Sequence, residues 1–258
     1  MFKKLICTLL LLTLFVCGCG KNNPKDDLDV ITNRGKLIVG VRNDTKPFGY
    51  KDINGTLQGY DIDLAKYIAK DVLGDMEAVE FVPVNASNRI SKLNAREVDI
   101  VIATMSITNQ RQLVVDFSVP YHVAGQAILV KKGSDITSLR QLNNRKVIII
   151  YGSTGEMSIR RNVPDAAIIG FRSYLDGFKA LKNGEADAMI ADDTILLNLA
   201  LNDSSVKILP KRYSREPYAV AFRRGGGADR LKERVNFLIN NLLVTGKIEK
   251  MQKKWEIK

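Results

Sequence analysis

The sequence predicts an α/β fold made of two similar lobes that are joined by two crossing segments. Strand-like and helix-like segments alternate along the chain, which is typical of parallel sheets covered by helices. The stretch LNAREVDIVIAT at 93–104 also returns as LKNGEADAMIAD at 181–192, with Leu first, Glu fifth and Asp seventh in both copies. Each copy has the pattern of a helix end, a turn and a buried strand, so the same architecture is expected twice.

The first unit begins with a buried strand, KLIVGV at 36–41. The dipeptide Asn54-Gly55 then favours a two-residue hairpin turn. The apolar residues at 62, 65, 68, 69 and 72 share one face of a helix that begins at Tyr60 and ends at Gly74. A strand, a helix and a second strand are expected next, at 79–84, 89–95 and 98–103.

The second unit repeats this order from the strand RKVIII at 145–150. A helix from Gly155 is followed by a strand, a helix, a strand and a helix, expected at 166–171, 174–184, 186–191 and 194–201. Strands at 124–133 and 216–225 are the natural crossings, and two amphipathic helices occupy 228–255. We therefore expect one lobe at 31–123 and 218–258 and the other at 124–217, with crossings near 123–127 and 214–219.

The first eighteen residues have the pattern of a secretory signal peptide. Two lysines precede an apolar run, and that run is too short to span a membrane as a helix. In VCGC at 16–19, the small residue before Cys19 resembles a lipoprotein signal box, which predicts cleavage before Cys19 and a lipid on its sulfur. An ordinary signal peptide with unrelated cysteines is the alternative. Residues 19–30 are expected to form a lipidated, polar tether.

Composition narrows the classes of function. The three cysteines all lie in this N-terminal region, so we expect no disulfide in the folded part. With no cysteine and one histidine there, we expect no metal and no cofactor. The formal net charge of +11 falls to +9 when Lys3 and Lys4 are removed (11 − 2), but the basic residues are scattered. A solvated basic surface is therefore expected, and nucleic-acid binding is not.

Polar residues follow the predicted strands, at the edge where ligands bind in open α/β sheets. Thr104 and Asp192 end the two copies of the repeat, so they are expected to meet across a cleft. Thr108 is a plausible N-cap that places Arg111 in the first turn of a helix, where a carboxylate ligand would bind it. A local ion pair is the alternative for Arg111.

Further polar and aromatic residues complete the expected site. Ser153 and Glu156 fit a capping box, and Thr154 beside them would offer a second contact to an anion. Arg42 and Arg89 also follow predicted strands, although each alone could be a surface arginine. One Asp and three Arg would suit a ligand with one ammonium and two carboxylates. Tyr60 and Tyr174 would line the ligand's aliphatic part, or else pack in the core.

The sequence resembles the polar amino-acid solute-binding proteins of ABC uptake systems, family 3. The resemblance covers about residues 35 to 220. The stretches that carry it are GKLIVGVRNDTKPFGY, GYDIDLAKYIAK, VDIVIATMSITNQRQLVVDFSVPY, YGSTGE and EADAMIADD. It implies a periplasmic-binding-protein-like fold, in which two α/β lobes are joined by a two-segment hinge.

The resemblance also implies roles for residues. Arg111 would clamp the ligand α-carboxylate, and Asp192 would bind the α-ammonium. Side chains that assist would be Thr104, Ser106, Thr154 and, packed over the ligand, Tyr60. Arg42 and Arg89 resemble the aspartate/glutamate subgroup, in which the second arginine faces the side-chain carboxylate. Tyr174 stands where one such relative has a His.

The expected function is that of an exported, lipid-anchored receptor at the outer face of the cytoplasmic membrane. It would be a monomer, bind L-glutamate or L-aspartate by lobe closure, and deliver the amino acid to a permease and its ATPase. One alternative is glutamine or another polar amino acid as the ligand. The other is an enzyme similar to a cyclohexadienyl dehydratase, although the sequence supplies no Glu at a predicted strand end to act as a general acid.

Overall fold

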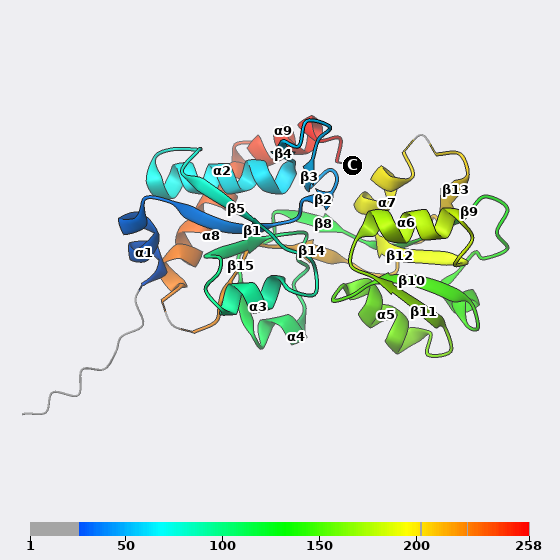
Figure 1. Ribbon diagram of the computed structural model, residues 1–258. Helices are drawn as coiled ribbons and strands as arrows, with labels where there is room; N and C mark the ends of the chain where they lie inside the picture. The colour runs from blue at the N-terminus through cyan, green and yellow to red at the C-terminus, as the bar shows by residue number, and fades with distance from the viewer. Residues whose placement is uncertain (1–25, 202, 226, 258) are drawn as a thin grey trace, which may run out of the picture.

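The computed structural model describes residues 26–201, 203–225 and 227–257. Within these residues the chain forms two lobes that lie side by side, each built on a five-stranded sheet with helices on both faces (Figure 1). The predicted α/β class is therefore confirmed. The predicted signal peptide at 1–18 and the predicted lipidation site Cys19 lie outside the described residues.

The sheet of the first lobe has the strand order β5-β1-β6-β15-β7. Its first three strands are parallel, and β15 is antiparallel to β6. The strands are β1 Leu37–Val41, β5 Val79–Pro83, β6 Ile100–Ile102, β7 Val115–Phe117 and β15 Ala221–Arg223. The helices of this lobe are α1 Asp27–Arg34, α2 Tyr60–Leu73, α3 Arg89–Asn94, α4 Asn109–Gln112, α8 Asp229–Val244 and α9 Lys247–Lys254.

The sheet of the second lobe has the order β11-β10-β12-β9-β13, with the first three strands parallel and β9 antiparallel to β12. The strands are β9 Gln126–Lys131, β10 Lys146–Ile150, β11 Ala167–Phe171, β12 Ala188–Asp192 and β13 Val206–Ile208. The helices are α5 Thr154–Asn162, α6 Tyr174–Lys182, α7 Asp193–Leu199 and the short 3-10 helix Leu139–Leu142. The three parallel strands thus follow the same order in both lobes, which bears out the repeat seen in the sequence.

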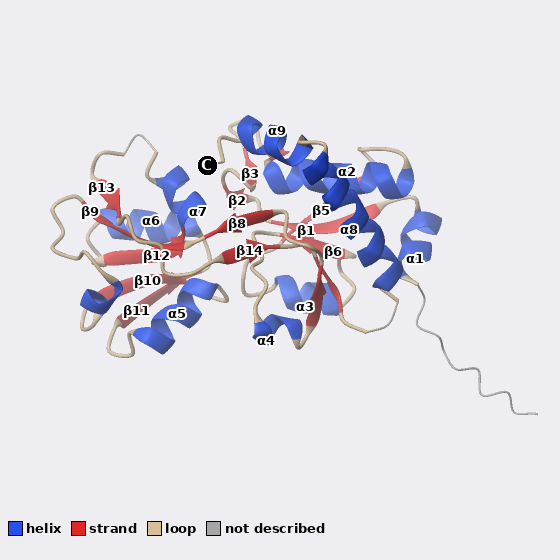
Figure 2. Ribbon diagram, turned by 180° about the vertical axis from the view of Figure 1, so that it is seen from behind, coloured by secondary structure: helices blue, strands red, loops and turns tan. Residues whose placement is uncertain are grey.

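Two segments connect the lobes through the paired strands β8 His122–Ala124 and β14 Glu216–Tyr218 (Figure 2). The sequence predicted one strand at 124–133 and one at 216–225. Each predicted strand is instead divided into two: β8 and β14 pair with each other between the lobes, and β9 and β15 belong to the sheets of the lobes. The interruption at Gly125 is tight, since a Cβ atom there would lie 3.0 Å from the carbonyl oxygen of Ser214.

A small hairpin sheet supports the beginning of α2. Its strands are β2 Asp44–Thr45, β3 Gly49–Lys51 and β4 Leu57–Gln58, and the predicted turn at Asn54-Gly55 connects the last two. Gly59 then has φ +138°, and a Cβ atom there would lie 2.1 Å from the carbonyl oxygen of Phe48. Only glycine fits this close approach, which holds the hairpin against the N-terminus of α2.

The expectation of a tether over the whole of 19–30 is wrong for its last residues, because 27–30 belong to helix α1. The Asp26 carboxylate caps this helix by accepting from the Leu28 amide at 2.9 Å. Leu28 and Ile31 are buried, and the buried Asp27 lies 2.7 Å from Arg223. Apolar burial and an ion pair to a distant strand therefore order a segment whose polar composition suggested a flexible chain.

No helix in the described part of the chain combines the length and the apolarity that crossing a membrane requires.

Candidate functional site

The nine residues predicted for the site are all buried in this structure, although most of them are polar. They are Arg42, Tyr60, Arg89, Thr104, Ser106, Arg111, Thr154, Tyr174 and Asp192. The three arginines lie near one another: burial, and then the nearby charges of Arg111 and Arg42, lower the pKa of Arg89 to about 9. The convergence of the three arginines expected from their strand ends is therefore observed.

Arg111 bridges the two lobes. The Thr108 hydroxyl accepts from the Arg111 amide at 3.2 Å, so the predicted N-cap of α4 is confirmed. The Arg111 guanidinium donates to the carbonyl oxygen of Ser106 at 2.7 Å and, across the lobes, to that of Gly152 at 3.0 Å. No carboxylate among the described residues lies within ion-pair distance of Arg111, so the alternative of a local ion pair is not observed.

Asp192 ends β12 opposite Arg111. Its carboxylate accepts from the Tyr218 hydroxyl at 2.5 Å. Burial, and then the nearby Glu216 carboxylate, raise the pKa of Asp192 to about 7. The adjacent Asp193 has a different task, because it accepts from the Gly125 amide at 3.1 Å and pairs with Arg212 in the crossing segments. The preference for Asp192 as the residue that faces the site agrees with these contacts.

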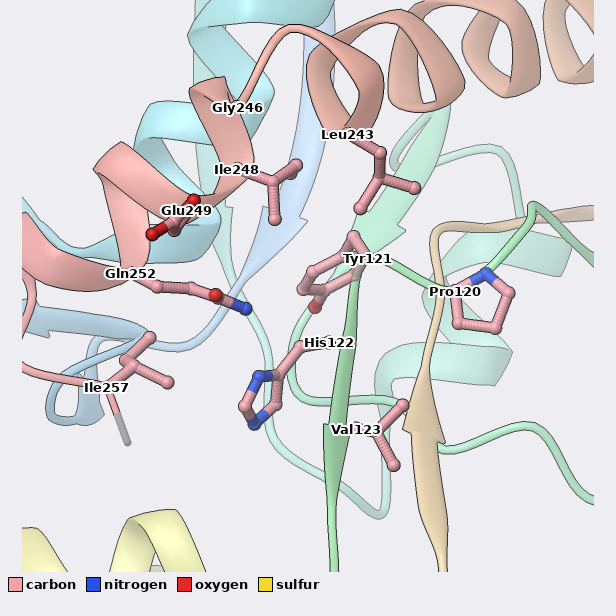
Figure 3. A pocket seen from close by; sticks show the side chains of 10 residues that line it. All are labelled: Pro120, Tyr121, His122, Val123, Leu243, Gly246, Ile248, Glu249, Gln252 and Ile257. Atoms are coloured by element: carbon pink, nitrogen blue, oxygen red, sulfur yellow. The ribbon is translucent and has the colours of Figure 1, made fainter.

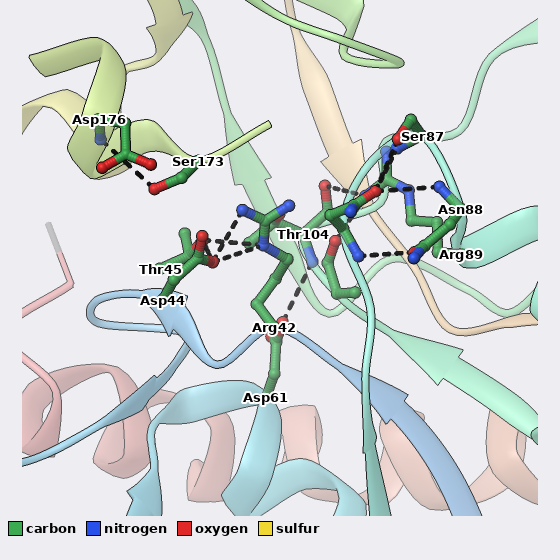
Figure 4. A network of polar contacts seen from close by, with 12 residues as sticks. Arg42, Asp44, Thr45, Asp61, Ser87, Asn88, Arg89, Thr104, Ser173 and Asp176 are labelled. Carbon is green, nitrogen blue, oxygen red and sulfur yellow. Dashed lines mark hydrogen bonds and ion pairs between the residues drawn. The ribbon is translucent and has the colours of Figure 1, made fainter. Parts of the chain in front are cut away.

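Arg42 follows β1 but has a local partner, which the sequence analysis did not anticipate. Its Nε donates to the Asp44 carboxylate and to the Thr45 hydroxyl, both at 3.0 Å, and its Nη2 lies 2.8 Å from Asp44 (Figure 4). The Arg42 side chain is 1% exposed, and the Tyr174 ring of the other lobe stacks on it at 5.3 Å. Its charge is therefore balanced within the protein.

Arg89 is held by the backbone at the end of β6 (Figure 4). Its Nη1 donates to the carbonyl oxygens of Ala103 at 2.5 Å and Thr104 at 3.2 Å. Thr104 has φ +46°, a left-handed conformation that is uncommon for a β-branched residue. The Asp61 carboxylate accepts from the Thr104 amide at 3.1 Å. Arg89 thus supports a strained turn at the edge of the site.

Tyr60 is the first residue of α2 and packs among aromatic side chains. It is fully buried, and its hydroxyl donates to the carbonyl oxygen of Tyr121 at 2.9 Å. Its ring packs near Phe48, Tyr121 and His122. These contacts fit the alternative of ordinary packing, and the expected position of Tyr60 over a ligand stays a prediction.

The N-terminus of α5 faces lobe 1. The Ser153 hydroxyl accepts from the Glu156 amide at 3.1 Å, which confirms one half of the predicted capping box. The Glu156 carboxylate accepts from the Gly152 amide at 2.8 Å instead of the Ser153 amide. Thr154 is the first residue of the helix and is 9% exposed. A Cβ atom on Gly152 would lie 2.5 Å from the carbonyl oxygen of Ala86, so the lobes are in close contact here.

The sequence analysis missed Asp44, Asp61, Tyr218 and Gly152. Asp44 stands two residues after Arg42, at the start of β2, a spacing that allows the pair but does not require it. Asp61 lies in the first turn of α2, where an acidic residue is common for the helix dipole alone. Tyr218 and Gly152 act through contacts between segments far apart in the sequence, which a local pattern does not reveal.

A cavity of about 460 Å³ lies behind the crossing strand β8 (Figure 3). Tyr121, just before β8, and His122, its first residue, line the cavity on one side, and Leu243 of α8 and Gln252 of α9 line it on the other. Burial lowers the pKa of His122 to about 4, so its imidazole is neutral near pH 7. The interpretation of His122 as a packing residue near a crossing is supported by its contacts with Phe48 and Tyr218.

The residues of the candidate site offer groups of opposite charge. Arg111 and the N-terminus of α5 offer donors to an anion, and Asp192 offers an acceptor to a cation. In the described residues, no group of three or more His, Cys, Asp or Glu side chains could hold a metal ion.

A family model described as bacterial extracellular solute-binding proteins, family 3, matches residues 37–258. The ABC transporter glutamine-binding protein GlnH of Bacillus subtilis (strain 168) is 37% identical over 98% of this chain and 97% of that protein. The glutamine-binding protein of Geobacillus stearothermophilus is 42% identical over 75% of this chain and 74% of its own length. A solved ancestral arginine-binding protein bound to glutamine covers 87% of this chain and 99% of its own, with 40% identity and a TM-score of 0.81.

Proposed function

The chain belongs to the bacterial extracellular solute-binding proteins, family 3, and from this we propose that it captures L-glutamine for an ABC uptake system by closing its two lobes. As a member it is an exported amino-acid receptor that works with an ABC transporter. The family and the relatives named above bind solutes, which favours a receptor over the dehydratase-like enzyme.

The α-amino and α-carboxylate groups of the ligand would bind between the lobes. The Arg111 guanidinium, with the free N–H groups of the first turn of α5 and the Thr154 hydroxyl, would bind the carboxylate. The Asp192 carboxylate would accept from the ammonium. Each charge-assisted hydrogen bond contributes about 1.5–3 kcal/mol, and several are needed because removing a zwitterion from water is costly.

The ion pair between Arg42 and Asp44 is the observation that favours glutamine over glutamate as the ligand. The sequence analysis expected Arg42 and Arg89 to face a side-chain carboxylate. In this structure Asp44 neutralises Arg42, and backbone carbonyl groups hold Arg89. Because Asp44 already compensates the charge of Arg42, a ligand carboxylate beside Arg42 would gain less from that arginine, whereas a neutral amide finds both donors and acceptors. Two relatives are also named for glutamine binding.

The test compares L-glutamine with L-glutamate on the wild-type protein and on Asp44→Asn, by calorimetry. We expect the wild type to prefer glutamine. Asp44→Asn frees Arg42 to meet a ligand carboxylate, so the preference should shift towards glutamate by about tenfold or more. Glu77→Gln removes the same charge from an exposed pair with Lys66 and should leave the preference unchanged. A wild type that already prefers glutamate would restore the acidic ligand expected from the sequence.

Anchoring and closure complete the proposal. Lipid on Cys19 would hold the receptor at the membrane, and replacing Cys19 by Ser should release it into the medium.

We place the lobes at 31–123 with 218–258 and at 124–217, and expect a monomer, because one ligand between two lobes needs no second copy. The connecting strands β8 and β14 would absorb the closing motion.

A further inference from the structure

We infer that Asp61 is a positioning residue of the ligand site, which holds the peptide bond before Thr104 in a strained turn. Asp61 is fully buried and lies in the second position of α2. It makes no contact across the lobes, so the proposed binding mechanism does not use it directly. A buried carboxylate is costly unless hydrogen bonds and a nearby positive charge compensate it.

Opposite charges hold the two ends of this one peptide unit. The Asp61 carboxylate accepts from the Thr104 amide at 3.1 Å, and the Arg89 guanidinium donates to the Ala103 carbonyl oxygen at 2.5 Å (Figure 4). The Ala103 carbonyl and the Thr104 amide belong to the same peptide bond. Its orientation is therefore fixed by an anion on one side and a cation on the other.

This orientation matters because Thr104 is strained. Its φ of +46° lies in the left-handed region, which is unfavourable for a threonine. Such strain persists only where the surroundings impose it. Asp61 and Arg89 supply that constraint, since the two charged side chains together bond both peptide units that flank Thr104.

The strained turn sets the ligand-facing edge of lobe 1. Two residues after Thr104, the carbonyl oxygen of Ser106 accepts from Arg111 at 2.7 Å. Ser106 also forms a bridge with Tyr218, whose hydroxyl binds Asp192. A turn that relaxes at Thr104 would therefore displace Arg111, which the proposed function assigns to the ligand carboxylate.

Asp61 has a second contact on its other side. Its carboxylate accepts from the Tyr121 hydroxyl at 2.9 Å, and Tyr121 precedes the crossing strand β8 and lines the cavity behind it (Figure 3). This contact allows a purely structural role, in which Asp61 only ties α2 to the hinge. Tyr121→Phe removes that contact alone and serves as the matched control.

The test is a double-mutant cycle between Asp61→Ala and Thr104→Gly, read as the affinity for L-glutamine at a temperature well below unfolding. Asp61→Ala should weaken binding by about thirtyfold in the wild type. Glycine adopts a positive φ at little cost. In the Thr104→Gly background, Asp61→Ala should therefore lower the affinity for L-glutamine by only about threefold. Thr104→Ala measures the loss of the hydroxyl separately, and Tyr121→Phe should leave the affinity unchanged.

Asp61→Asn provides the second route if the alanine variant does not fold. It keeps the shape but weakens the acceptor, so the same coupling with Thr104→Gly is expected at smaller amplitude. Equal losses in both backgrounds, or lower thermal stability with wild-type affinity, would overturn the positioning role. Because the inference rests on the proposed site, the wild type is also titrated with L-glutamate. If the protein binds glutamate and not glutamine, the proposed ligand is wrong, and the double-mutant cycle is then measured with glutamate. If it binds neither amino acid, both the proposed function and the positioning role of Asp61 are overturned.

Discussion

At the scale of single residues, the partners of the buried charged side chains determine which ligand groups the candidate site would accept. Arg111 bonds carbonyl oxygens on both lobes, and Arg42 is paired with Asp44. The sequence was sufficient to place these arginines after strands of the first lobe, and their roles towards a ligand stay predictions. Their partners could not be predicted, since Asp44 and the carbonyl groups that hold Arg89 are brought close only by the fold.

The first prediction concerns Arg111. Arg111→Lys keeps the charge but loses the planar group that binds a carboxylate with two parallel hydrogen bonds. We expect the affinity for L-glutamine to fall about thirtyfold or more, measured by calorimetry, with the thermal midpoint little changed. Arg145→Lys alters an exposed pair with Asp135 and should have no effect. Equal affinities for wild type and Arg111→Lys would exclude the assigned role.

The second prediction concerns pH and Asp192. Its pKa in the unliganded protein is raised to about 7 by burial and by Glu216. A bound ammonium favours the carboxylate and lowers that pKa, so binding releases a proton where Asp192 is still protonated. Affinity should therefore increase from about pH 5 and level off above about pH 8.

Calorimetry in two buffers of different ionisation enthalpy measures the proton released on binding. Asp192→Asn should abolish both the release and the pH dependence, although its affinity will be lower. Affinity that is flat or falls over this range would show that Asp192 does not receive the ammonium.

At the scale of elements, helix N-termini and tight glycines position the site. Thr108 and Ser153 cap α4 and α5, and both caps were readable from the sequence because they involve residues three apart. The repeated strand order was also predictable from the alternation of segments. Helix α1 was not predictable, since its stability comes from the distant Arg223 and from the burial of Ile31.

The third prediction belongs to α5. Ser153→Ala removes the hydroxyl that caps the helix and should lower the free energy of unfolding by about 1 kcal/mol, or about 2–4 °C in the thermal midpoint. Ser153→Thr keeps the acceptor and should restore most of the loss. Scanning calorimetry measures both. If the two variants were equally destabilised, packing of the side chain and not capping would be responsible.

At the scale of the whole molecule, the two lobes meet in a closed arrangement. The contacts between them include the Arg111 bond to Gly152, the stacking of Tyr174 on Arg42, and the close approach of Gly152 to Ala86. Sequence patterns predicted two lobes and two crossings. They could not predict how the lobes meet, because that depends on backbone positions with no side-chain signature.

The fourth prediction tests closure at Gly152. Gly152→Ala introduces a Cβ that would lie 2.5 Å from the Ala86 carbonyl oxygen, at φ +78°. Gly133→Ala is a matched control in the same lobe, since it has φ +90° and nothing within 4 Å. Both should lose about 1 kcal/mol of stability. Only Gly152→Ala should weaken ligand binding, by about tenfold or more, and prevent the compaction that small-angle scattering detects on ligand addition. Equal affinities for the two variants would contradict the closure.

The most direct test of the central claim is calorimetry on the purified protein after unfolding and refolding to remove any bound amino acid. The titrants are L-glutamine, L-glutamate, L-aspartate, L-asparagine, L-histidine and L-arginine. The account predicts one-to-one binding that is tightest for glutamine, with glutamate weaker because Asp44 already neutralises Arg42. Binding that is tightest for glutamate or aspartate would contradict the neutral side-chain site, and no binding of any of the six would contradict the receptor itself.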